Sequence, residues 1–136
     1  MHRIIYILLV ISFNGFAQDT LTVDDGSIWW SKGSCSVDYR CYENIDEIIE
    51  MHCSDSITVT SIELRENTFE HSKHQYTECR AQRLADYLRG KHEMNVGSIV
   101  GTPILMTSSE MRQAIAEQNF RTIIIVFGKP EPLDSL

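Results

Sequence analysis

Four cysteines are the strongest candidates for reactive side chains in the sequence: Cys35, Cys41, Cys53 and Cys79. Five, eleven and twenty-five residues separate them, so no pair has the CxxC spacing of zinc ribbons and fingers. A structural zinc site is therefore disfavoured. In an oxidising compartment the four cysteines predict one or two disulfides, whereas a cysteine nucleophile would require a free, activated thiolate. For Cys79, a buried free thiol is the alternative.

Other reactive residue types give weaker patterns. His71 and His74 could share a metal ion on a helix, but no carboxylate or cysteine at a matched spacing completes the set. Trp29 and Trp30 could stack on a sugar, although adjacent aromatics at a strand start more often fill a core edge. Ser98 does not lie in a GxSxG motif. We therefore expect no metal, no cofactor and no enzymatic activity.

The compartment can be inferred from the first seventeen residues. A basic start at Arg3 precedes an unbroken apolar run over residues 4–11, which is too short to span a bilayer. The small residues Gly15 and Ala17 then stand at the −3 and −1 positions of a possible cleavage site. This order predicts a secretory signal peptide, export across the inner membrane and location in the periplasm or at the outer membrane. A buried first strand or an uncleaved anchor is the alternative.

Composition predicts one folded domain. The 136 residues are 43% apolar and 23% charged, with a formal net charge of −7. This excludes a long disordered chain, and the acidic balance disfavours nucleic acid as a partner. No second segment is long enough to cross a membrane. We expect a linker over residues 18–26, a domain over residues 27–128 and a flexible tail over residues 129–136.

Strands and helices alternate along that domain. Start signals for three helices come from Asn44 with Glu47 and from capping boxes at Ser72–Gln75 and Thr107–Glu110. The expected helices span residues 44–53, 72–90 and 107–118, and the expected strands span residues 27–30, 56–62, 96–100 and 122–127. The second strand should carry a bulge near Ser61, and the last, a β-branched run, should be buried on both faces. The order β-α-β-α-β-α-β predicts an α/β (α+β) fold with a single mixed sheet covered by helices.

Two motifs resemble a known family. Residues 77–88, TECRAQRLADYL, are similar to the helix LSxxRAxxVxxYL of the peptidoglycan-associating, OmpA-like domain, with Tyr76-Thr77 in place of Leu-Ser. Residues 116–123, AEQNFRTI, are similar to the family's AxxNRRVxI. Between them, residues 96–101 followed by Pro103 resemble a compressed form of the family's IxxxGxGxxxP connection. The resemblance covers about residues 27–128.

The resemblance implies a ligand site for diaminopimelate in the peptide stem of peptidoglycan. Arg80 matches the family's arginine, which takes the ligand carboxylate, while an acid takes the ammonium group. The family's acid lies in a GxTDxxG turn, and alignment without a gap places Arg65 there. A one-residue shift brings Glu66 into that role, and a larger shift brings Glu63.

The second motif adds Asn119 and Arg121 to the ligand-binding candidates. Arg121 could alternatively neutralise the carbonyl groups at the end of the preceding helix.

For the disulfides, the expected fold pairs Cys41 with Cys79, because parallel neighbouring helices bring their N-terminal ends together. Cys35 and Cys53 are then left over. The pairing of Cys35 with Cys41 and of Cys53 with Cys79 stays open.

Two alternative functions are therefore expected. The first is an exported, non-catalytic domain that binds peptidoglycan. The second is a secreted structural or protein-interaction module of the same fold, which has lost that ligand and whose expected partner is an envelope protein. A carboxylate facing Arg80 across a gap of about 5–7 Å predicts the first function, and Arg65 facing it predicts the second.

Overall fold

The sheet is organised around a long strand, β2 (Thr58–Phe69), which lies between two neighbours. The computed structural model of the chain describes residues 18–52, 58–72, 75–117 and 120–128. Strand β2 pairs with β3 (Val96–Met106) in parallel and with β4 (Arg121–Gly128) antiparallel. Strand β1 (Gln18–Val23) completes the order β1-β4-β2-β3 by pairing antiparallel with β4. The predicted single mixed sheet is confirmed.

Strand β1 corrects the expectation that residues 18–26 form a linker. Leu21 and Val23 are buried and alternate with exposed threonines, so this segment has the two-residue period of a half-buried strand. Residues 27–30, which were expected to be the first strand, contribute instead an isolated bridge between Trp30 and Val37. The sheet therefore begins nine residues earlier in the chain than predicted.

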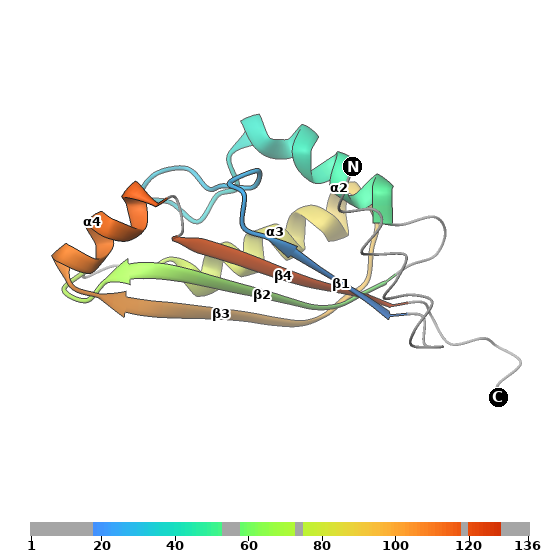
Figure 1. Cartoon of the computed structure of the whole chain (residues 1–136). Helices are drawn as coiled ribbons and strands as arrows, with labels where there is room; N and C mark the ends of the chain where they lie inside the picture. Colours follow the sequence, from blue (N-terminus) through green and yellow to red (C-terminus); the bar gives the residue numbers. More distant parts are fainter. Residues whose placement is uncertain (1–17, 53–57, 73–74, 118–119, 129–136) are drawn as a thin grey trace, which may run out of the picture.

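Helices cover one face of the sheet. A short 3-10 helix, η1 (Tyr39–Cys41), leads into α2 (Tyr42–His52), and α3 (Thr77–Lys91) connects the two parallel strands. Figure 1 shows α2 and α3 on the same side of the sheet, while α4 (Ser108–Ala116) lies at one end of it. No helix within the described ranges is both long and apolar enough to cross a bilayer.

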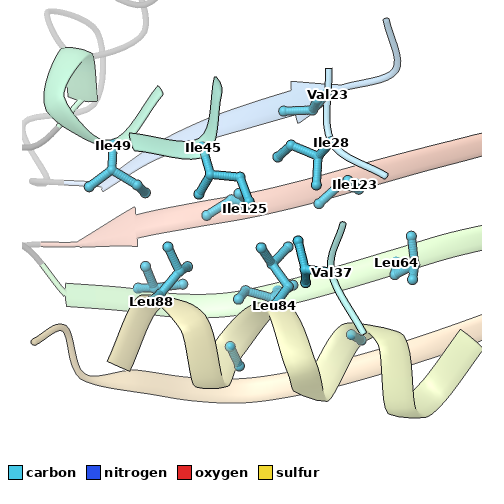
Figure 2. Close-up of a cluster of buried hydrophobic side chains, with 14 of the residues drawn as sticks. Val23, Ile28, Val37, Ile45, Ile49, Leu64, Leu84, Leu88, Ile123 and Ile125 are labelled. Carbon is cyan, nitrogen blue, oxygen red and sulfur yellow. The ribbon is translucent and has the colours of Figure 1, made fainter. Parts of the chain in front are cut away.

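The core fills the space between these helices and the sheet (Figure 2). Side chains from α2, α3, β2 and β4 converge there and are almost fully buried, among them Ile45, Ile49, Leu64, Leu84, Leu88, Ile123 and Ile125. Strand β4 is buried on this face, but Thr122 and Ile124 on its other face are only half-buried. The expectation of burial on both faces is wrong, because α2 and α3 cover a single side.

Several predicted boundaries shift for physical reasons. The capping box at Thr107–Glu110 starts α4 as expected, and the bulge between Val59 and Ser61 is present. By contrast, α3 begins at Thr77 rather than at residue 72, since the backbone N–H of Ser72 closes a turn on Phe69. Strand β3 continues through Pro103 to Met106, which an edge strand tolerates because one side of it carries no ladder hydrogen bonds.

Candidate functional site

Glu66 is a carboxylate on the buried face of β2. The strand alternates so that Ile62, Leu64 and Glu66 point toward the core, and Glu66 is only 4% exposed. A carboxylate in such a position needs paired partners, because removing an unpaired charge from water is costly. Two arginines supply them.

Arg121 is the first partner and comes from the neighbouring strand. The antiparallel register of β2 and β4 sets Arg121 directly opposite Glu66. The Nε and Nη2 atoms of Arg121 lie 2.9 and 2.8 Å from Oε2 of Glu66. Its guanidinium also lies 5.0 Å from the ring centroids of Trp30 and Phe120. The positive charge is thus held between a carboxylate and two aromatic faces.

Arg80 is the second partner and comes from the first turns of α3. A Cβ added at Gly101 of β3 would lie 2.7 Å from the backbone nitrogen of Glu78, so the absence of a side chain lets α3 rest on the strand. Nη1 of Arg80 then donates to Oε2 of Glu66 at 2.8 Å, and the hydroxyl of Thr77 donates to Oε1 at 3.3 Å. We call Glu66, Arg80 and Arg121 the Glu66 cluster.

The Glu66 cluster has more positive than negative charge, because two guanidinium groups face one carboxylate. The side chains of Glu66, Arg80 and Arg121 are 5%, 12% and 14% exposed. At such low exposure solvent screens the charges weakly, and the excess positive charge favours an additional anion. An open cleft of about 470 Å³ lies beside Arg121, between α4 and the sheet, with Arg65, Gln113 and Glu117 among its lining residues.

A turn of the chain between Trp30 and Val37 covers Arg80. Within residues 31–36, which we call the hairpin tip, the carbonyl oxygens of Ser34 and Ser31 accept from Nε and Nη2 of Arg80 at 2.8 and 3.3 Å. Each of the three guanidinium nitrogens of Arg80 therefore already donates within the chain. The indole Nε1 of Trp30 in turn donates to the backbone carbonyl of Arg80 at 3.0 Å.

The predicted site residues separate into two groups. Arg80, Glu66 and Arg121 come together, so a shift of one residue from the ungapped alignment does bring Glu66 to Arg80. Glu63 lies on the opposite face of β2, where its carboxylate binds Arg65 at 3.0 Å instead of approaching Arg80. Asn119 lies outside the described residues.

The gap expected between Arg80 and its carboxylate is absent. Glu66 contacts Arg80 directly at 2.8 Å, so the predicted separation of about 5–7 Å is wrong. Arg65, which would have indicated a lost ligand site, does not face Arg80 either. The expected carboxylate is therefore present, but it contacts Arg80 directly instead of facing it across a gap.

The disulfide joins Cys35 to Cys79, with a Cα–Cα distance of 5.6 Å. The expected pairing of Cys41 with Cys79 is wrong, as are the alternative pair Cys35–Cys41 and a free thiol at Cys79. The physical reason is that the hairpin tip folds back over the start of α3, whereas Cys41 at the end of η1 points into the core. Cys53 lies outside the described residues.

Cys41 is a buried thiol with 0% exposure. Its Sγ donates to the carbonyl oxygens of Asp38 and Trp29 at 3.1 and 3.3 Å. Burial raises the pKa of the Cys41 thiol, so it remains protonated and behaves as a small core residue.

Sequence reasoning missed the groups that close the Glu66 cluster. Thr77 had a usable signal, because it precedes Arg80 by three residues and therefore shares its helix face. The carbonyl groups of Ser31 and Ser34 had none, since any residue supplies a backbone carbonyl.

A second missed network joins α2 to α3. Oδ1 of Asp46 accepts from the Tyr87 hydroxyl at 2.7 Å and lies 2.8 Å from Nε2 of His92. Burial opposes ionisation of Asp46, but the hydrogen bonds from Tyr87 and His92 outweigh it and lower the pKa of Asp46.

Comparison with known proteins identifies no family for this chain. No protein-family model matches the chain, and no curated protein shows significant similarity to it. The resemblance of residues 77–88 and 116–123 to the OmpA-like family therefore remains a prediction from the sequence.

Proposed function

We propose that this chain is an exported, non-catalytic domain that binds the peptide stem of peptidoglycan through the Glu66 cluster. The observation that carries the proposal is the charge imbalance of that cluster, in which Arg80 and Arg121 share one carboxylate in a poorly screened position. A ligand carboxylate would balance the second guanidinium.

Diaminopimelate fits this chemistry because its end is a zwitterion. Its carboxylate can form a two-pronged hydrogen bond with a guanidinium, and its ammonium group can approach Glu66.

Export is supported by the disulfide between Cys35 and Cys79. Disulfides persist in the periplasm and outside the cell, whereas the cytosol keeps most thiols reduced. The periplasm, and attachment near the outer membrane, remain part of the proposal.

The test is sedimentation of the chain, as secreted by an expression host, with purified insoluble peptidoglycan under oxidising and reducing conditions. We expect binding that free diaminopimelate inhibits and that Arg80→Ala abolishes. Arg83→Ala is the matched control, since Arg83 lies on the same helix with its side chain 61% exposed. Circular dichroism establishes that each variant is folded. Binding that survives Arg80→Ala would contradict the assigned site.

A second candidate is supported by the closure of the site. Because all three nitrogens of Arg80 donate within the chain, the Glu66 cluster could serve the fold alone, in a structural or protein-interaction module. Absence of peptidoglycan binding in both redox states would favour this function over the first.

A further inference from the structure

The hairpin tip has the geometry of a small cover over Arg80. At its base, Trp30 and Val37 form a β-bridge, and both are nearly buried. Within the tip, the N–H of Ser31 donates to the carbonyl of Ser36 at 2.9 Å, and Gly33 turns the chain with a φ of 64°. The tip is therefore a compact turn on a buried base.

The links from the hairpin tip to α3 are concentrated at one place. Ser34 and Cys35 are consecutive residues, as are Cys79 and Arg80. The disulfide between Cys35 and Cys79 therefore holds the Ser34 carbonyl beside the guanidinium that it binds. A covalent bond and a charge-assisted hydrogen bond thus join the same two short segments.

We infer that the Cys35–Cys79 disulfide locks the hairpin tip over Arg80, and that its reduction by a dithiol opens the Glu66 cluster to a carboxylate ligand. The inference deepens the proposed function, on which its choice of ligand rests. It assigns to that site a redox control that sits at the hairpin tip rather than in the ligand-binding groups.

The lock works through competition for the same donors. Nε and Nη2 of Arg80 bind two neutral carbonyl groups, whereas a carboxylate would accept both N–H groups with its full charge. While the disulfide is closed, the carbonyls cannot diffuse away, so their effective concentration at Arg80 is very high. Once it is open, a carboxylate can displace them.

The contacts outside the hairpin tip remain in place when the tip opens. Trp30 remains buried at the base and keeps its hydrogen bond to the Arg80 carbonyl, and Arg80 keeps its contact with Glu66. Cys35 and Cys79 are both partly exposed, so a thiolate can reach the disulfide. Opening the tip therefore exposes donors without removing the core.

The chemistry is a thiol–disulfide exchange. One thiolate of the dithiol attacks a sulfur of the Cys35–Cys79 bond, forms a mixed disulfide with that cysteine and releases the other cysteine as a thiolate. The second thiol of the reductant, as its thiolate, then attacks the reductant sulfur of the mixed disulfide and releases the first cysteine. Two electrons and two protons pass to Cys35 and Cys79, and the reductant leaves as a disulfide. No other reactant is required.

The decisive experiment measures access to Arg80 without any natural ligand. Phenylglyoxal, which modifies accessible guanidinium groups, is applied to the wild-type chain and to Cys35→Ser/Cys79→Ser, and each arginine is followed by mass spectrometry. We expect modification of Arg80 to rise at least about tenfold in the variant, because reactivity follows the population of the open tip. Arg83, already exposed, should react equally in both chains.

Amide hydrogen exchange provides a second measurement on the wild-type chain with and without dithiothreitol. Exchange should accelerate at residues 31–36, while the amides of Leu84 and Leu88 in α3 stay protected. Unchanged modification of Arg80, or loss of protection at Leu84 and Leu88 together with the tip, would overturn the lock.

Peptidoglycan sedimentation separates this inference from the proposed function. Binding by the dithiothreitol-treated chain but not by the oxidised chain supports both. Faster modification of Arg80 without binding in either state would leave the lock in place and refute peptidoglycan as the ligand. Equal binding in both redox states would overturn the lock and leave the proposed function intact.

Discussion

Strand β2 carries two glutamate–arginine contacts whose surroundings differ. Glu63 and Arg65 lie on one face with their side chains 32% and 50% exposed, and their guanidinium–carboxylate distance is 3.0 Å. Glu66, three residues after Glu63, lies on the other face at 5% exposure and binds both Arg80 and Arg121. The contact distances are similar, so the difference lies in burial and in the number of partners.

The face of the strand on which an ion pair lies decides what that pair does for the fold. In water, the attraction between Glu63 and Arg65 is largely offset by hydration and side-chain entropy. At Glu66 the charges have lost their water, so each depends on its partners, and removal of one partner leaves an uncompensated charge. The buried contacts therefore fix the positions of α3, β4 and the hairpin tip, whereas the exposed pair fixes nothing beyond β2.

Replacing the buried carboxylate is expected to have the largest effect. Glu66→Gln leaves Arg80 and Arg121 facing each other with no carboxylate between them, which should lower the free energy of unfolding by about 3–5 kcal/mol. Urea denaturation followed by circular dichroism measures this loss. The matched variant Glu63→Gln should leave the denaturation midpoint unchanged within error, and equal losses in both variants would show that burial is not the deciding difference.

Removing the covalent link beside the buried cluster comes next. The Cys35–Cys79 bond closes a loop with a sequence separation of 44 residues. Its loss in Cys35→Ser/Cys79→Ser should lower the free energy of unfolding by about 2–4 kcal/mol, mainly because the unfolded chain becomes less constrained. Thermal denaturation measures the change. Cys41→Ala serves as a comparison, since Cys41 forms no bridge, and its cost should come from lost packing and from the hydrogen bonds of its Sγ.

A conservative change of the cation should have a smaller effect. Arg80→Lys keeps the charge, but an ammonium group cannot reach Glu66, Ser31 and Ser34 with the fixed geometry of a guanidinium. We expect a loss of about 1–3 kcal/mol in the free energy of unfolding. Arg65→Lys should leave the free energy of unfolding unchanged in the same urea titration. If Arg80→Lys also left the free energy of unfolding unchanged, only the charge at this position would matter.

The smallest effect concerns two histidines that repeat the contrast between buried and exposed pairs. His52 is 5% exposed, with Nδ1 3.6 Å from Asp19, whereas His71 beside Glu70 is 76% exposed. Burial lowers the pKa of His52 below its ordinary value of 6.5, although Asp19 partly opposes this. The unfolded chain then binds the proton more readily, so the protein should lose stability as the pH falls below about 6.5.

Thermal melts from pH 7.5 to 5 test this prediction. His52→Gln should reduce the dependence on pH. A wild-type melting temperature that rises on acidification through this range would contradict the predicted direction.

Elements fixed by neighbouring residues were the most predictable from the sequence. The capping box at Thr107–Glu110 depends on hydrogen bonds between residues three apart, and it is present. Strand β1 was missed because its hydrophobic pattern is short, and its stability comes from pairing with β4. The extension of β3 through Pro103 likewise depends on a position at the sheet edge, which a local pattern does not reveal.

The site was predictable in part for similar reasons. The choice between Glu66 and Glu63 was left open because the predicted strand ended at residue 62, whereas the alternation from Ile62 through Leu64 continues to Glu66 in the structure. The partner of Cys79 could not be deduced, because it depends on the fold-back of the hairpin tip. The direct contact between Glu66 and Arg80 also depends on the approach of α3 to Gly101, which only the assembled structure reveals.

The pairing of β1 with β4 also sets the order in which the chain can fold. These are the first and last strands of the sheet, and residues 18–23 pair with residues 123–128. A nascent or translocating chain can form the parallel β2–α3–β3 unit early, because the contacts within it span a short stretch of sequence. Strand β1 must wait, with Leu21 and Val23 uncovered, until the final strand has emerged. We therefore expect completion of the sheet to be a late step in folding, and strand β1 to be the segment most in need of protection from aggregation.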